Sequence, residues 1–335
     1  MSRFLASAGL FVAASASSLL MVEALLRVAG FSFSIAPSSV VFGWPRPVSI
    51  EERYEVDPDL FWHPRDYDTK LARLTRERPD IVFLGDSCTE FGIYPGLLME
   101  RLQRQHPGRP IRGAALGASA WSSYQGLAQL RRDVLPLGPR IVGFYFGWND
   151  HWLGFGVEDA DVPRISGLGL ATLHDLRISQ LLFKAWLAGR AWTLAAKPLR
   201  VPPDDFRANL REMARLTRAA GAVPVLLTAP TSHELGLEPE YLAERYVADL
   251  REVVPLHQRY VSIVREVAKE EAAVLCDLAA RFDELPRDDV KTHYFMIDGI
   301  HLKPAGDAKI SEFLDECFRE SPELAAELDR ISGGA

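Results

Sequence analysis

The feature that most constrains the fold is a series of five short apolar segments separated by stretches with helical spacing. The segments cover residues 81–84, 111–116, 141–146, 223–228 and 273–277. Apolar runs of this length are typical of strands that are buried on both faces. Strands that alternate with helices predict an α/β fold, a doubly wound five-stranded parallel sheet with helices on both faces. The active site of such a sheet lies at the carboxyl ends of its strands.

The N-terminal region differs in composition from the rest of the chain. Residues 4–22 carry no charge, and about 20 apolar residues are enough to cross a bilayer core. We therefore expect residues 1–30 to form a signal anchor, an N-terminal transmembrane helix that holds the folded domain outside the cytoplasm, in the periplasm or at the cell surface. Ala14-Ser15-Ala16 also resembles a cleavage site, in which case the protein would be secreted.

Two further regions interrupt the pattern of strands and helices. Residues 31–75 are rich in proline and are interpreted as a linker and entry segment to a domain over 76–335. Residues 153–204 break the alternation, and their apolar stretch 178–196 predicts a helical insertion. This insertion either packs on the edge of the core or forms a lid over a substrate pocket.

Composition and charge exclude several classes of function. The chain has 335 residues and a formal net charge of -7, whereas a nucleic-acid partner requires a basic surface. Three cysteines do not form a disulfide framework, so we expect each to be a small buried residue, although two could still pair. The spacing of Cys and His indicates no zinc site. We expect neither a metal nor an organic cofactor.

Three polar residues carry the strongest chemical prediction. Ser87 directly follows the first predicted strand, in Gly85-Asp86-Ser87, and so lies at the carboxyl edge of the sheet. Near the other end of the chain, Asp298 precedes His301 by three residues. A serine hydroxyl needs a base to become a nucleophile, and a carboxylate can orient the imidazole that serves as this base. Asp298 and His301 form the only Asp-x-x-His in the chain, which favours His301 over the nearby His151.

Two more predicted strand ends bear groups that suit acyl transfer. Gly117 follows the second strand and Asn149 follows the third. A backbone N–H and a side-chain amide are suitable donors to an oxyanion, although Gly and Asn are also common in turns. Trp148 and Trp152 lie beside Asn149 and are candidates for substrate binding, with a place in the core as the alternative.

Taken in order, these blocks resemble the SGNH/GDSL hydrolase superfamily. The matching residues are Gly85-Asp86-Ser87, Gly117, Gly147-x-Asn149-Asp150 and Asp298-x-x-His301. The chain also resembles a bacterial subgroup with an N-terminal membrane segment. The resemblance implies a flavodoxin-like, three-layer α/β/α sandwich and no cofactor. It further implies Ser87, His301 and Asp298 as the catalytic triad, with an oxyanion hole formed by Ser87, Gly117 and Asn149.

The resemblance implies a serine esterase. We expect it to remove O-acyl groups, short ones such as acetyl, from an envelope carbohydrate or lipid. An O-acyltransferase acting on a cell-surface polysaccharide uses the same residues and is the first alternative. A non-catalytic glycan-binding protein of the same fold is the second. The sequence gives no indication of oligomeric state.

Overall fold

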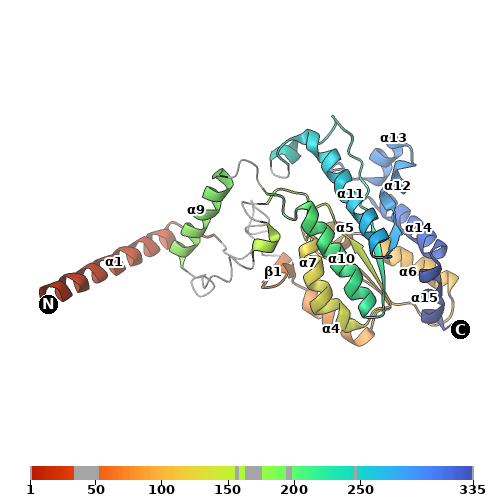
Figure 1. Cartoon of the computed structure of the whole chain (residues 1–335), viewed down its shortest axis with the longest axis horizontal. Coiled ribbons are helices and arrows are strands. Elements are labelled where there is room, and N and C mark those ends of the chain that lie inside the picture. The colour runs from red at the N-terminus through yellow and green to blue at the C-terminus, as the bar shows by residue number, and fades with distance from the viewer. Residues whose placement is uncertain are drawn as a thin grey trace. The chain divides into compact units, whose positions relative to one another are not determined.

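The computed structural model describes residues 2–33, 53–154, 158–162, 176–193, 198–244 and 247–333. These residues form two compact units (Figure 1). The first unit comprises residues 1–52 and 154–197, and the second comprises residues 53–153 and 198–335. Parts of the predicted linker (34–52) and of the predicted insertion (155–157, 163–175 and 194–197) lie outside the described residues.

The α-helices in the described residues of the first unit are α1 (Ser2–Val28) and α9 (Arg177–Thr193). Glu23 of α1 accepts hydrogen bonds of 3.0 Å from the backbone N–H groups of both Arg177 and Ile178. A carboxylate in this position satisfies N–H groups that have no partner within the first turn of α9. The two helices of this unit therefore meet at the start of α9.

None of the helices in the described part of the chain is both long and apolar enough to cross a membrane. The expected transmembrane helix over residues 1–30 is therefore not supported.

The second unit contains the predicted parallel sheet. Its strands are β3 (Ile81–Gly85), β4 (Gly113–Gly117), β5 (Ile141–Tyr145), β6 (Val223–Leu227) and β7 (Val274–Cys276). They are all parallel, in the order β4-β3-β5-β6-β7, so the chain reverses direction of winding between β3 and β5. This order is the flavodoxin-like one. The prediction of an α/β fold with a five-stranded parallel sheet is confirmed.

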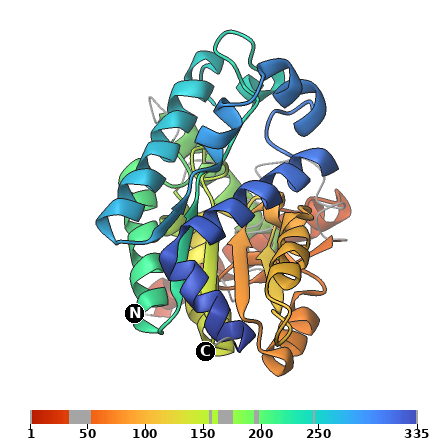
Figure 2. The same cartoon turned by 90° about the vertical axis from the view of Figure 1, so that its right-hand side faces the viewer.

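Helices cover both faces of the sheet. On one face α10 packs between α7 and α11 and contacts β6, and on the other face α6 packs against α14 (Figures 1 and 2). The helices of this unit are α4 (Tyr67–Glu77), α5 (Ser87–Glu90), α6 (Tyr94–Gln105), α7 (Ser123–Gln129), α10 (Pro203–Ala219), α11 (Val253–Glu270), α12 (Leu278–Asp283), α13 (Arg287–Asp289), α14 (Pro304–Glu320) and α15 (Pro322–Ser332). β3 and β5 are buried along their whole length, as strands between two helical layers must be.

The described end of the entry segment is a hairpin of β1 (Tyr54–Asp57) and β2 (Phe61–Pro64). Trp62 is fully buried, and its indole N–H donates to the backbone oxygen of Ser119 at 3.0 Å. In return, the indole N–H of Trp121 donates to the backbone oxygen of Trp62 at 2.9 Å. These reciprocal bonds attach the hairpin to the loop that follows β4.

Two of the three cysteines are paired. Cys276 at the end of β7 and Cys317 in α14 form a disulfide with a Cα–Cα distance of 5.7 Å, whereas Cys88 is free and buried. The expectation that each cysteine is an unpaired buried residue is wrong for this pair. The reason is tertiary, since the packing of α14 against β7 brings together two residues that are 41 positions apart.

Candidate active site

Ser87 lies at the carboxyl edge of the sheet because β3 ends in a tight turn. A Cβ on Gly85 would lie 2.9 Å from the backbone oxygen of Tyr145 and would overlap Thr89, so only glycine fits here. The Asp86 carboxylate then accepts the backbone N–H of Cys88 at 2.9 Å and caps α5. This turn presents Ser87 at the first position of the helix.

Asp298 and His301 lie in a short hairpin whose two sides meet at Phe295 and Leu302. One oxygen of Asp298 accepts the backbone N–H groups of Ile300 and His301, each at 2.9 Å. The other oxygen lies 2.6 Å from Nδ1 of His301. The carboxylate therefore holds both the backbone of the hairpin and the imidazole ring.

The hairpin brings His301 to Ser87. Nε2 of His301 lies 2.8 Å from Oγ of Ser87, although the two residues are 214 positions apart. Cys88 adds a second link, since its thiol lies 3.7 Å from the backbone oxygen of Ile300. A hydroxyl, an imidazole and a carboxylate thus lie in series within hydrogen-bond distance, which is the geometry of a nucleophile with its base and orienter.

The electrostatics of this series favour the charged forms of both Asp298 and His301. Burial acts against a charged imidazole, but the hydrogen bond and the negative charge of Asp298 outweigh it and raise the pKa of His301 above its ordinary value. Burial likewise acts to raise the pKa of Asp298, but hydrogen bonds from His301 and from the backbone hold it below the ordinary value. Asp298 is therefore ionised at neutral pH and stabilises the imidazolium form of His301.

Gly117 and Asn149 lie close to the same turn. A Cβ on Gly117 would lie only 2.7 Å from the backbone oxygen of Asp86, which directly precedes Ser87. Nδ2 of Asn149 donates to the Asp86 carboxylate at 3.0 Å. An amide nitrogen carries two hydrogens, so this bond fixes the Asn149 side chain and leaves it a second donor.

Trp148 and Trp152 lie in a buried cluster. Their exposed fractions are 2% and 5%, and their rings stack with centroids 5.8 Å apart. Trp148 also stacks on His257 at 3.8 Å, and Nδ1 of His257 lies 3.1 Å from Nε2 of His151. The structure places both tryptophans among core residues, and their predicted role in substrate binding stays a prediction.

Residues 231–233, which follow β6, support the hairpin of Asp298 and were not singled out by the sequence. Nε2 of His233 donates to the backbone oxygen of Asp298 at 2.7 Å. The backbone N–H of Ser232 and the hydroxyl of Thr231 both donate to the backbone oxygen of Gly299, each at 3.1 Å. Gly299 has a φ of +72°, and a Cβ there would overlap the His233 ring. The one indication in the sequence is their position after a predicted strand.

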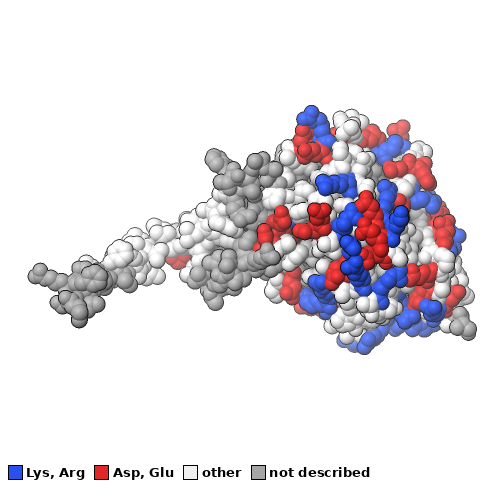
Figure 3. All heavy atoms as spheres, in the orientation of Figure 1, with Lys and Arg blue, Asp and Glu red and all other residues white. Residues whose placement is uncertain are grey.

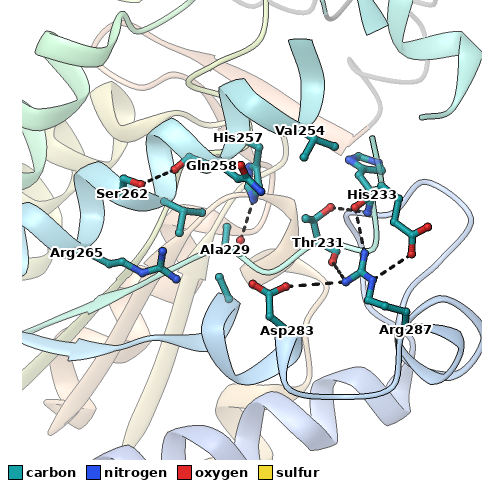
Figure 4. A pocket seen from close by; sticks show the side chains of 13 residues that line it. Ala229, Thr231, His233, Val254, His257, Gln258, Ser262, Arg265, Asp283 and Arg287 are labelled. Carbon is teal, nitrogen blue, oxygen red and sulfur yellow. Dashed lines mark hydrogen bonds and ion pairs between the residues drawn. The ribbon is translucent and has the colours of Figure 1, made fainter. Parts of the chain in front are cut away.

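A pocket of about 430 Å³ lies beside this segment (Figure 4). Thr231, His233 and His257 line it, together with Arg287, whose guanidinium donates to the backbone oxygens of Thr231 and His233. Ser87 and His301 are not among the residues that line it. The hydrogen-bonded series, which has reactive groups, is therefore the better candidate for the reaction centre. Within the described residues, no group of three or more His, Cys, Asp or Glu side chains is placed to hold a metal ion.

Comparisons with known proteins show the family of this chain. Residues 83–309 match the GDSL-like Lipase/Acylhydrolase family. No curated protein sequence gives a significant match. Among solved structures, a lipase/acylhydrolase from Enterococcus faecalis is 16% identical with a TM-score of 0.47, covering 73% of this chain and 98% of that one. A GDSL-like lipase from Bacteroides thetaiotaomicron is 18% identical with a TM-score of 0.45, covering 78% and 97%.

An acetyl xylan esterase structure is also similar, at 17% identity and a TM-score of 0.46, with 70% of this chain and 96% of that one covered. At these identities a structural likeness concerns the fold alone. The family match carries more weight, since it spans more than half of the chain and includes both Ser87 and His301. The chain therefore belongs to the GDSL-like lipase/acylhydrolase family and is an ester hydrolase of the SGNH type.

Proposed function

We propose that the protein is a serine esterase that hydrolyses O-acyl esters of an envelope carbohydrate or lipid in two steps. The observation that carries this proposal is the unbroken series from Ser87 Oγ to His301 Nε2 and from His301 Nδ1 to Asp298. In the first step His301 removes the proton of Ser87 while the serine oxygen attacks the ester carbonyl. The ester C–O bond then breaks, and His301 returns the proton to the departing alcohol.

The second step reverses these roles with water. His301 takes a proton from a water molecule as its oxygen attacks the acyl-enzyme, and the proton then returns to Ser87 as the acid leaves. The oxyanion of each tetrahedral intermediate is stabilised by the N–H groups of Ser87 and Gly117 and by the Asn149 amide. Loss of one such donor typically costs about 3 kcal/mol in barrier. Asp86 supports this role, because it orients the Asn149 side chain.

The deciding experiment replaces the proposed nucleophile. Ser87→Ala is expected to abolish turnover of p-nitrophenyl acetate and covalent labelling by a fluorophosphonate. Ser262→Ala, a serine of α11 whose hydroxyl donates to the backbone oxygen of Gln258, is the matched control and should retain both. Circular dichroism checks that each variant folds. Turnover that survives Ser87→Ala in a folded protein would exclude Ser87 as the nucleophile.

The proposal includes a location outside the cytoplasm. The disulfide between Cys276 and Cys317 supports it, because disulfides persist mainly in oxidising compartments. The uncharged run over residues 4–22 is compatible with an export sequence. Cell fractionation with thiol alkylation tests the location: protein from the envelope or medium should show one alkylated cysteine after denaturation, whereas a reduced cytoplasmic protein would show three.

A further inference from the structure

The exposed large hydrophobic side chains of the second unit are confined to three short segments. Within its described residues, those side chains are Phe91, Ile93, Leu235, Leu237, Tyr241, Met296 and Ile297, which we call the apolar rim. Ile297 is the extreme case, with 98% of its surface exposed. Single exposed hydrophobic residues scattered over a surface need no explanation, but a concentrated group indicates an interaction site.

The first two rim segments directly adjoin residues of the proposed triad. Phe91 lies one turn after Ser87, and its backbone N–H donates to the backbone oxygen of Ser87 at 3.0 Å. Met296 and Ile297 precede Asp298 in the hairpin, where the N–H of Gly299 closes a turn on the oxygen of Met296 at 3.1 Å. Since His301 contacts Ser87, both segments adjoin residues that meet at the reactive hydroxyl.

The third rim segment is held against the same hairpin. Ser232 and His233 donate to the backbone oxygens of Gly299 and Asp298. Leu235 follows His233 by two residues and Leu237 by four. A chain advances at most about 3.6 Å per residue, so both leucines lie within reach of the triad. Each segment of the apolar rim therefore follows or precedes residues that belong to the proposed triad or bond to its hairpin.

The outer face of α10 and α11 shows the contrast. Three arginines of α10 (Arg207, Arg211 and Arg215) form ion pairs with three glutamates at the end of α11 (Glu266, Glu270 and Glu271). Figure 3 shows acidic and basic side chains interspersed over this side of the molecule. The face of α10 and α11 thus carries paired charges, whereas the large exposed hydrophobic side chains of the second unit's described residues lie in the apolar rim.

We propose that the apolar rim docks the enzyme onto the hydrocarbon surface of a lipid assembly and so delivers long-chain esters to Ser87. This inference rests on the proposed function and narrows its substrate to an ester carried by lipid. A lipid surface is favoured over a protein partner by the position of the rim. A protein seated on all three segments would cover the reactive hydroxyl, whereas a lipid surface supplies the substrate itself.

The test compares two substrates in the same full-length variants. Ile297→Asp and Phe91→Asp should lower kcat/KM on p-nitrophenyl palmitate in phosphatidylcholine vesicles by roughly 10-fold or more, because each removes the burial of one large apolar side chain and places a charge in hydrocarbon. Turnover of monomeric p-nitrophenyl acetate should change less than about 2-fold. Leu182→Asp, an exposed leucine of the first unit, is the matched control.

A second measurement does not depend on activity. In a Ser87→Ala background, Ile297→Cys labelled with a polarity-sensitive fluorophore should shift to the blue on addition of phosphatidylcholine vesicles. The same label at Glu212→Cys on α10 should not shift. An absent shift at position 297, or equal losses on both substrates, would overturn the docking role. The proposed function would still stand if p-nitrophenyl acetate turnover depended on Ser87.

Discussion

His301 and His257 lie in the same unit and have opposite environments. His301 bonds to the Asp298 carboxylate, its side chain is 37% exposed, and its pKa is raised. His257 is buried against Trp148, and its Nε2 donates to the backbone oxygen of Ala229 at 2.8 Å. Its Nδ1 lies within hydrogen-bond distance of Nε2 of His151. Burial lowers the pKa of His257 to about 4, so this ring stays neutral where His301 can gain a proton.

The difference shows what separates the proposed base from a structural histidine. Both rings lie within hydrogen-bond distance of a partner on each nitrogen, so hydrogen bonding alone does not distinguish them. A carboxylate partner and access to solvent let His301 exchange a proton and stabilise the charge that results. His257 has neither, and its polar atoms serve to satisfy neighbouring groups in the core.

The largest expected effect comes from exchanging glutamine for each histidine. His301→Gln should lower kcat/KM for p-nitrophenyl acetate by roughly 10⁴- to 10⁶-fold, because the members of a catalytic triad act as a unit. His257→Gln keeps an amide in the core and should lower kcat/KM by less than about 10-fold. Steady-state kinetics on folded variants measure both. Comparable losses in the two variants would remove the distinction between them.

Asp298→Asn should have the next largest effect. It keeps the shape of the side chain but offers no charge to the ring, and kcat/KM should fall by roughly 10⁴-fold, as in other Ser-His-Asp sites. The pH profile sharpens the prediction. In the native enzyme, kcat/KM should rise through the His301 pKa, above the ordinary 6.5. In the variant the rise should move to lower pH, because the group that raises this pKa has been removed.

The buried His257 should affect the pH dependence of the free energy of unfolding rather than turnover. The folded-state pKa of His257 lies below its unfolded value, so the unfolded chain binds the extra proton first. Its contribution is present above pH 6.5 and is lost as the pH falls towards about 4. A depression from 6.5 to about 4 corresponds to roughly 3 kcal/mol in the free energy of unfolding.

Urea unfolding at pH 7 and pH 4.5 measures this loss, and His257→Gln supplies the comparison. The variant should be less stable than the native protein at pH 7 but should lose less stability on acidification. The carboxylates titrate in both the native protein and the variant. The difference between the two proteins in how steeply the free energy of unfolding changes with pH therefore comes from His257. Parallel slopes would show that His257 is not held neutral in the fold.

How much of this could be predicted depends on how local each feature is. The continuous apolar run predicts a strand at 81–84, and the structure has it at Ile81–Gly85. The spacing of Asp298 and His301 likewise predicts a carboxylate beside an imidazole ring. The structure brings Ser87 to them, while their catalytic roles stay predictions. The strand expected at 111–116 begins at Gly113, because its first residues lead in from the preceding loop.

Long-range contacts could not be predicted. The pairing of Cys276 with Cys317 depends on how α14 packs, and the sequence could not choose among three cysteines. Trp148 is buried against His257, which lies more than 100 residues away in the sequence.

The smallest expected effect concerns His233, which shares burial with His257 but bonds to the hairpin that carries His301. Burial lowers its pKa, as for His257, yet its ring donates to the backbone oxygen of Asp298 and packs edge-on against Trp148 at 5.5 Å. We expect it to position the hairpin. His233→Leu should lower kcat by roughly 10-fold with little change in KM, since a small misplacement of a catalytic group is costly.

His233→Gln can restore the donor and should recover most of kcat, which separates a positioning role from simple packing. His63→Leu, another buried histidine, is the control, and it should affect stability without changing kcat. The pH dependence of kcat adds a measurement that a loss of packing alone would not change. If His233→Leu displaces Asp298, the pKa of His301 should fall and the rise of kcat should move to lower pH. If His233→Leu and His233→Gln have equal kcat values, the bond to Asp298 does not contribute to catalysis.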